Sequence, residues 1–256
     1  MASSTGPDVV TDGLLSYFDI SNPRCVDATQ SITSNTRLNN LAESDIQLQP
    51  YDVSNGNMSF VIDEGQYVYN QNGINGGNPC WVSTANVERY DVYTLICWFK
   101  YNRTSQRSDQ IFSTGFSDTN SVGSAFYLTS GYADRNGIIQ RFWRYGQYFN
   151  TYIINNNYGA GDNNWHQFAS VSSFGTSSTP YTKFYLDGIY KSEVILTGST
   201  FGVYRPTDPS EMIWGAWKPN DRNFNGKTNC FMYYNRALTA EEISQNFNAT
   251  RGRFGI

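Results

Sequence analysis

Residues 93–101 (YTLICWFKY) constrain the fold more than any other stretch of this sequence. The run is aromatic and aliphatic, a composition that suits a pleated, half-buried surface. Successive side chains of a strand point to opposite faces of its sheet, so a strand over these residues carries apolar groups on both faces. Such a strand needs cover on both sides, which predicts a central place in a layered β-fold.

Short strand patterns separated by turn residues run through most of the chain. We expect strands within residues 13–19, 58–62, 67–69, 93–101, 111–112, 125–129, 137–150 (two strands joined at Gly146), 162–171, 183–190, 212–214 and 230–234. Gly65 and the pair Asp187–Gly188 suit hairpin turns that need positive φ, whereas residues 27–57 predict a long surface loop. The pattern predicts an all-β fold with two antiparallel sheets packed as a sandwich.

Aromatic side chains are expected to fill that sandwich. Only 39% of the residues are hydrophobic, but 16% are aromatic, so rings stand in for a shortage of aliphatic bulk. Cys25, Cys80, Cys97 and Cys230 are widely spaced and form no metal-binding motif. Cys97 and Cys230 sit inside apolar strand patterns, which predicts small buried hydrophobic side chains.

The closing stretch carries the only convincing helix signal. Thr239 stands three residues before Glu242, the spacing of a capping box. Ile243 and Phe247 are four residues apart, so they share one face that can pack on a sheet. The helix is expected to end near Gly252.

We predict residues 1–12 as a flexible N-terminal arm and residues 13–256 as a single domain, because no linker or repeat divides the sequence. The net charge of −4 disfavours a nucleic-acid partner. No apolar run approaches the roughly 18–20 residues of a membrane span. The first residues lack the basic and apolar segments of a secretory signal, which predicts synthesis and folding in a reducing cytoplasm.

A glycan-binding platform is the strongest candidate site in the pattern. Arg141, Trp143, Tyr145 and Tyr148 combine aromatic faces, on which sugars stack, with a planar hydrogen-bonding group. The alternative is structural, because aromatic ladders also stabilise sheets.

Metal binding is not expected. Asp118, Asn120, Asp162 and Asn163 are ligand types that calcium accepts, but turns favour the same residues for conformational reasons. We therefore predict no metal and no other cofactor.

Catalysis is not expected either. The only histidine, His166, together with Asp187 could suggest a catalytic triad, but no nucleophile elbow is present and Asp187 is explained by its turn. His166 is therefore predicted to be structural.

Four segments, in this order, resemble the laminin-G-like, concanavalin A-like family of jelly-roll domains. They are residues 13–23 (GLLSYFDISNP), residues 93–100 (YTLICWFK), residues 164–169 (NWHQFA) with 184–188 (FYLDG), and residues 234–243 (YNRALTAEEI). The last segment, with residues 245–254, is most similar to versions found in tailed-phage structural proteins. The resemblance implies a jelly-roll sandwich of two antiparallel sheets with the helix packed near its rim.

The resemblance also implies a function. We expect a non-enzymatic virion structural protein, used for head decoration or in a neck, tail or fibre. It would bind other virion proteins as a symmetric homo-oligomer and, through the platform, host-surface polysaccharide. The alternative is a stand-alone lectin-like adhesin. A glycoside hydrolase is disfavoured because the Glu-x-Asp-x-x-Glu pattern of related glucanases is missing from this sequence.

Overall fold

The structure is a computed structural model, and it describes residues 7–42, 44–53, 57–72, 79–88, 90–102, 108–114, 122–129, 137–144, 147–152, 161–174, 180–195, 211–216 and 223–256. For residues 102, 108, 114, 122–129, 137–144 and 147–152 the description covers the backbone only.

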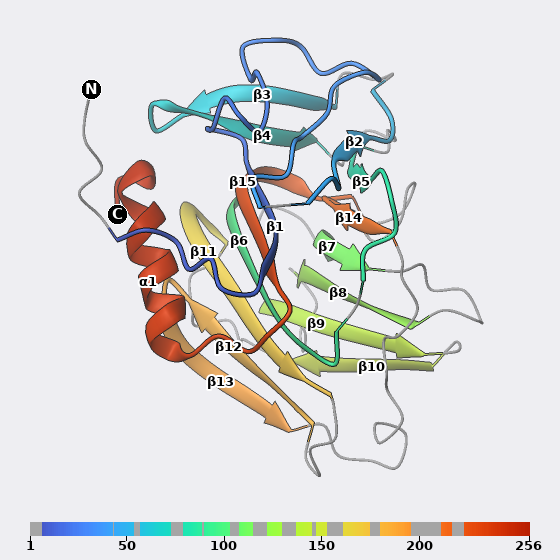
Figure 1. The fold of residues 1–256 in the computed structure, drawn as a ribbon, viewed down its shortest axis with the longest axis vertical. Coiled ribbons are helices and arrows are strands. Elements are labelled where there is room, and N and C mark those ends of the chain that lie inside the picture. The colour runs from blue at the N-terminus through green and yellow to red at the C-terminus, as the bar shows by residue number, and fades with distance from the viewer. Residues whose placement is uncertain are drawn as a thin grey trace.

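The first sheet has eight strands in the order β13-β12-β11-β6-β15-β4-β3, with β1 also paired to β15 (Figure 1). The bounds of its strands are β1 Leu14–Asp19, β3 Met58–Asp63, β4 Gln66–Asn72, β6 Val92–Asn102, β11 Asp162–Ser173, β12 Tyr181–Leu186, β13 Ile189–Ile195 and β15 Asn225–Tyr234. Every pairing in this sheet is antiparallel.

The second sheet has seven strands in the order β10-β9-β8-β7-β14-β5-β2. Their bounds are β2 Leu48–Pro50, β5 Trp81–Ser83, β7 Ser108–Thr114, β8 Val122–Thr129, β9 Gly137–Arg144, β10 Gln147–Tyr152 and β14 Met212–Trp214. The two antiparallel sheets form a jelly-roll sandwich, as predicted. The short strands β2 and β5 were not expected from the sequence, and β2 interrupts the predicted loop of residues 27–57.

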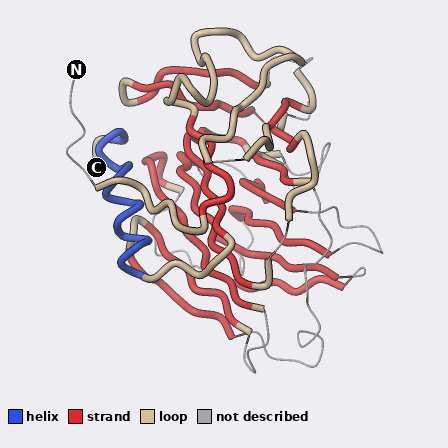
Figure 2. The backbone as a smooth tube through the Cα atoms, viewed as in Figure 1, coloured by secondary structure: helices blue, strands red, loops and turns tan. Residues whose placement is uncertain are grey.

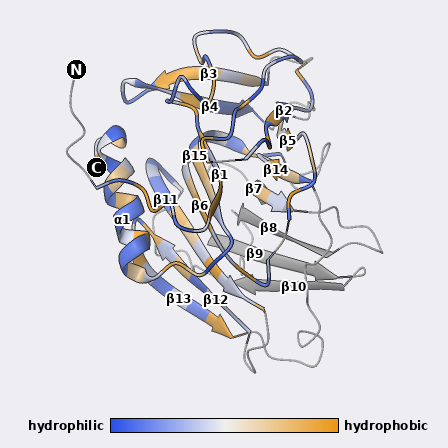
Figure 3. Cartoon of the chain, viewed as in Figure 1, coloured by the Kyte–Doolittle hydropathy of each residue, from blue (hydrophilic) through white to orange (hydrophobic). Residues whose placement is uncertain are grey.

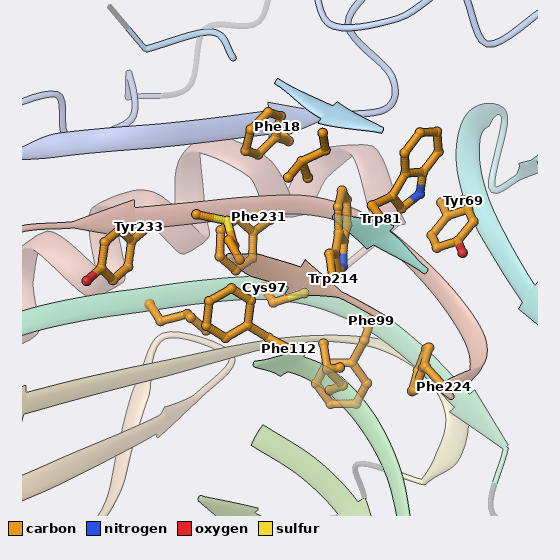
Figure 4. Close-up of a cluster of buried hydrophobic side chains, with 14 of the residues drawn as sticks. Phe18, Tyr69, Trp81, Cys97, Phe99, Phe112, Trp214, Phe224, Phe231 and Tyr233 are labelled. Atoms are coloured by element: carbon orange, nitrogen blue, oxygen red, sulfur yellow. The ribbon is translucent and has the colours of Figure 1, made fainter. Parts of the chain in front are cut away.

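Aromatic rings fill the space between the sheets (Figure 4). The Phe112 ring on β7 lies 4.7 Å from that of Phe231 on β15, so the pair joins the two sheets. Tyr69 on β4 contacts Trp81 and Trp214 edge-on, at 5.7 and 6.1 Å. Edge-to-face and offset pairs at these separations are the favoured aromatic geometries. The predicted substitution of rings for aliphatic bulk is therefore confirmed.

Strand β6 is central, as its apolar run predicts. Leu95, Cys97 and Phe99 face the intersheet core, whereas Ile96 and Trp98 belong to a second apolar cluster on the outer face of the first sheet. All five side chains are at most 1% exposed. The four cysteines of the chain are buried and unbonded to one another.

Two-residue turns close the hairpins β3–β4 and β12–β13. Glu64 and Gly65 have φ of 51° and 79°, and Asp187 and Gly188 have φ of 54° and 73°. Two successive positive φ angles are the signature of the type I′ turn, whose twist matches that of the flanking strands. Both predicted turns are confirmed.

Helix α1 (Ala240–Thr250) lies on the outer face of the first sheet (Figures 1 and 2), whereas the resemblance placed it near the rim. The predicted capping box is present: Glu242 N donates to Thr239 Oγ1, and Thr239 N donates to a Glu242 carboxylate oxygen. Ile243 is fully buried against the sheet, and Phe247 stacks on Trp98. The helix lies on the face because that face, not the rim, presents the apolar cluster around Trp98. Figure 3 colours the rest of α1 mostly as hydrophilic.

A short 3₁₀ helix, η3 (Arg251–Phe254), follows α1 and fastens the end of the chain. The Phe254 ring stacks on Trp98 at 4.2 Å and lies 4.7 Å from Trp165. The Arg253 guanidinium donates to the Asp19 carboxylate, which is buried beneath it on β1. Helix α1 ends at Thr250, so the predicted ending near Gly252 is confirmed, but the left-handed residue comes later, at Gly255 (φ 71°). Residues 251–254 keep right-handed helical turns, so the backbone turns left-handed only at Gly255, three residues after Gly252.

Residues 7–12, which the sequence assigns to the flexible arm, pack against α1 of the same chain. Val10 N donates to Asn246 Oδ1 at 2.8 Å, and Val10 O accepts from the Tyr234 hydroxyl at 3.0 Å. The Gln245 amide donates to Asp8 O at 2.8 Å. The ordered sandwich therefore includes at least the second half of that segment, while the boundary at residue 13 stays a prediction. The described helices are too short and too polar to cross a membrane.

Candidate glycan-binding site

A polar pocket of about 330 Å³ lies on the first sheet, and we call it the amide pocket. Its lining residues come from β4, β6, β15 and the start of β11: Asn70, Gln71, Asn72, Lys100, Asn163, Asn225, Gly226 and Lys227. Five of these eight carry a side-chain amide and two carry an ammonium group. The pocket is therefore a surface for hydrogen bonds, with little apolar wall.

Strand pairing brings these residues together. Asn72 lies directly opposite Asn225, Asn70 opposite Lys227, and Lys227 opposite Lys100 across β4, β15 and β6. Directly paired residues share one face of a sheet. Trp165 pairs with Lys100 and belongs to the cluster under α1, so the row lies on the outer face of the first sheet.

Asn163 joins the pocket through an irregularity in β11. The register between β11 and β6 shifts between Asp162 and Trp165, and Asn163 has a φ of 66°. Asparagine tolerates this left-handed conformation better than most residues. The shift carries an exposed amide to the side of the pocket.

One buried carboxylate holds both lysines of the pocket. Lys100 Nζ lies 3.1 Å from Asp63 Oδ1, and Lys227 Nζ donates to Asp63 Oδ2. The Asp63 side chain is 8% exposed. Burial raises the pKa of this carboxyl, but the hydrogen bonds and charges of the two ammonium groups outweigh burial and lower the pKa below its usual value. Asp63 therefore stays ionised and fixes the lysine side chains.

The predicted glycan platform falls on β9 and β10, on the second sheet. Trp143 pairs directly with Tyr148, and Arg141 with Asn150. Tyr145 lies outside the described residues, and at the other three positions the description stops at the backbone. The platform therefore stays a prediction.

The register also assigns a face to the platform positions. Arg141 pairs with Ala125, Ala125 with Ser113, and Ser113 with Ile213. Ile213 belongs to a small buried cluster separate from the intersheet core. Positions Arg141, Trp143 and Tyr148 thus lie on the outer face of the second sheet, whereas the amide pocket is on the outer face of the first.

His166 is clamped between two aspartates. Its Nδ1 lies 2.8 Å from Asp187 Oδ2, and its Nε2 lies 3.1 Å from Asp162 Oδ1. Asp187 Oδ1 also accepts from Gln167 N, which ties the β12–β13 turn to β11. Burial alone would lower the pKa of the imidazole, but the hydrogen bonds and charges of Asp187 and Asp162 raise it above its usual value. This arrangement gives His166 a bridging role between two elements.

The four predicted calcium-ligand types do not come together within the described residues. Asp118 and Asn120 lie outside them. The Asp162 carboxylate accepts from Asn164 and contacts His166 instead. In the part of the chain that the structure describes, no group of three His, Cys, Asp or Glu side chains is placed to hold a metal ion.

The amide pocket was not predicted from the sequence. Asn70 and Asn72 lie just beyond the strand expected at residues 67–69, and Lys100 lies within the strand expected at residues 93–101. A signal was available in the spacing: Asn70 and Asn72, like Asn225 and Lys227, stand two residues apart, the period of one strand face.

Solved structures with this fold come from several kinds of protein. The binding domain of Paraclostridial Mosquitocidal Protein 1 matches 93% of this chain with a TM-score of 0.63 and 14% identity, over 52% of its own length. Domain 4 of an extracellular arabinanase from Geobacillus stearothermophilus, solved with arabinotriose, matches 93% with a TM-score of 0.57 and 14% identity, over its whole length.

The ligand-binding domain of botulinum neurotoxin serotype D, solved with N-acetylneuraminic acid, matches 94% of this chain with a TM-score of 0.60 and 10% identity, over 52% of its own length. The chain thus spans about half the length of the two toxin domains. Identities this low establish the fold alone.

No curated protein matches this sequence. A family model does match, over residues 75–244, which is more than half of the chain. That segment runs from before β5 to the first turn of α1 and so includes the central strand β6 and the closing strand β15. The chain belongs to the concanavalin A-like lectin/glucanases superfamily, in its laminin-G-like branch.

Proposed function

We propose that this chain is a non-enzymatic carbohydrate-binding domain and that its amide pocket holds the sugar. The pocket itself carries the proposal, because four asparagine amides line it, those of Asn70, Asn72, Asn163 and Asn225. The fifth amide, on Gln71, is buried and donates to Pro79 O and Gly215 O instead. An amide offers two N–H donors and a carbonyl acceptor in one plane, which matches the paired donor and acceptor character of sugar hydroxyl groups. A volume of about 330 Å³ is within the usual range of small-ligand pockets.

The rigidity of the pocket supports the same proposal. Asn70, Asn72 and Asn225 stand on paired strands in the interior of the sheet, so their backbones are fixed before any ligand arrives. Preformed donors and acceptors reduce the ordering cost of binding.

The carboxyl groups near the pocket are poorly placed for catalysis, which supports binding without catalysis. Of the described residues that line it, none carries a carboxyl group. The nearby Asp63 is hydrogen-bonded to two lysines that keep it ionised, so it is a poor general acid. Release of reducing sugar from any glycan that binds would contradict this part of the proposal.

A glycan array read with the purified chain tests the binding, followed by titration of the best glycan. Asn72→Ala with Asn225→Ala removes two facing amides, and we expect affinity to fall by about tenfold or more. Asn248→Ala is the matched control, because Asn248 is an exposed amide on α1. An array with no signal would refute the proposal, as would equal losses in the control.

We further propose that the domain works in a tailed-phage virion, made in the host cytoplasm, and attaches the particle to host polysaccharide. Support comes from the closing segment, residues 234–254, which resembles those of phage structural proteins. Mass spectrometry of purified particles tests the proposal. Glycan binding by a chain that is missing from the particles would favour the stand-alone adhesin instead.

A further inference from the structure

The lysines of the amide pocket carry more positive charge than their buried partner balances. We propose that the sugar bound in the pocket carries a carboxylate and that Lys227 binds that group. This inference rests on the proposed carbohydrate-binding function and names the class of sugar that the pocket selects.

The two lysines share one buried carboxylate. Lys100 and Lys227 lie directly opposite each other on neighbouring strands, an arrangement that is unfavourable for like charges. Asp63 supplies one negative charge for the two positive ones. Glu64 is 3.6 Å from Lys100, but its side chain is 51% exposed, so water screens that charge. Lys100 thus has a second carboxylate nearby, whereas Lys227 has only its share of Asp63 among the ion pairs of the described residues.

The two ammonium groups have more N–H donors than Asp63 accepts. Each ammonium group has three N–H donors, and Asp63 accepts one from each lysine. The Lys100 side chain is 14% exposed and the Lys227 side chain is 33% exposed. Lys227 is thus the more accessible cation, and it retains donors that a ligand can use. Lys100 and Asp63 hold it in place.

A sugar with a carboxylate matches the groups that line the pocket. A carboxylate has two oxygens that accept several hydrogen bonds, and it binds most strongly to charged donors. Asn70 stands opposite Lys227 on the neighbouring strand and on the same face, so both residues line one wall of the pocket. Asn72 and Asn225 continue the row and are placed for the ring hydroxyls of the same sugar. A uronate or a sialate offers this combination on one ring.

The experiment compares acidic and neutral sugars on the intact chain by isothermal titration calorimetry. The acidic probes are tri-galacturonic acid and 3′-sialyllactose, and the neutral probes are methyl-esterified tri-galacturonic acid and lactose. We expect at least one acidic probe to bind about tenfold or more tightly than its neutral counterpart. The preference should shrink as sodium chloride rises from about 0.05 to 0.5 M, because salt screens the charge.

Three variants assign the preference to one residue. Lys227→Gln should lower affinity for the acidic probe by about tenfold or more and for the neutral probe by a clearly smaller factor, so that the acidic preference shrinks. Lys227→Arg should retain most of the affinity, because the charge is kept. Lys183→Gln on β12 is the matched control and should change neither probe.

The outcomes separate the two proposals. Equal affinity for acidic and neutral probes in the unchanged chain, or a Lys227→Gln variant that keeps the acidic preference, overturns this inference and leaves carbohydrate binding intact. An absence of binding to every saccharide on the array and among the probes overturns both. The comparison of probes needs no variant, so it stands even if a substitution prevents folding.

Discussion

Removal of the Phe254 ring should loosen the attachment of the C-terminal segment to the first sheet. Phe254 is 3% exposed, and its ring packs against two indoles, those of Trp98 and Trp165. The Phe254→Ala substitution deletes both ring contacts and leaves a space under η3.

The size of the effect follows from the burial. Replacement of a buried Phe by Ala costs about 3–5 kcal/mol, which combines lost transfer energy and the cavity left behind. The two aromatic contacts are worth about 0.5–1.5 kcal/mol each beyond their buried area. Because η3 is a four-residue helix that can shift toward the sheet, we expect the lower end, about 3 kcal/mol of unfolding free energy. For a chain of this size the melting temperature should fall by about 6–12 °C.

Urea denaturation followed by tryptophan fluorescence measures this loss, because Trp98 and Trp165 report on the packing directly. Ile256→Ala is the matched control: Ile256 is 45% exposed and only two residues away, so its loss should stay within about 0.5 kcal/mol. A Phe254→Ala loss below about 1 kcal/mol, or a loss equal to that of the control, would refute the view that this ring anchors the segment.

Three further predictions concern turns, the helix cap and pH. Gly188→Ala should cost more unfolding free energy than Gly65→Ala in urea titrations, because both glycines have positive φ but only at Gly188 would a Cβ meet Phe247, at 3.0 Å, whereas Gly65 faces open space. Thr239→Ala should cost about 1 kcal/mol in the same assay, since it removes the capping box of α1, and Thr239→Asn should restore most of the loss. The folded pKa of His166 is raised, so its contribution to stability should be complete below the unfolded value of about 6.5 and disappear as pH rises through the folded pKa. Urea midpoints between pH 5 and 9 measure this term, and a His166→Gln variant that keeps the same pH dependence in that range would contradict it.

The parts of the fold that sequence reasoning predicted are those in which local pattern and tertiary environment agree. Residues 93–101 are apolar on both faces, and β6 is covered on both. Asp187–Gly188 needs positive φ in any hairpin, and Thr239 with Glu242 makes contacts within four residues. Such features do not depend on the rest of the chain.

The parts that were missed depend on partners distant in sequence. Strand β5 has three residues, too few for a visible period, and it exists because it pairs with β2 and β14. The position of α1 depends on Trp98, more than 140 residues earlier, whose indole Nε1 donates to Thr250. Neither relation can be read from residues that are adjacent in the chain.

The amide pocket shows the same limit for function. Its lysines are drawn together by Asp63, which stands 37 residues before Lys100 and 164 before Lys227. The sequence shows each of the three as an ordinary strand or turn residue. The aromatic platform was the more visible pattern because Arg141 and Trp143 are close in sequence, whereas the amide pocket is built from four strands and its one local signal is a two-residue spacing of polar side chains.

The place of β15 also governs the order in which this chain can fold. It is among the last segments in the sequence, yet it pairs with β6, β4 and β1. The Tyr234 hydroxyl also donates a hydrogen bond to Val10 O, 224 residues earlier in the chain. Until residues 225–234 are synthesised, three early strands lack a neighbour, and closing so long a loop is slow. Unpaired strand edges are the surfaces through which nascent chains aggregate. Recombinant production should therefore benefit from cooler, slower expression, and truncation before Asn225 should yield insoluble protein rather than a smaller domain.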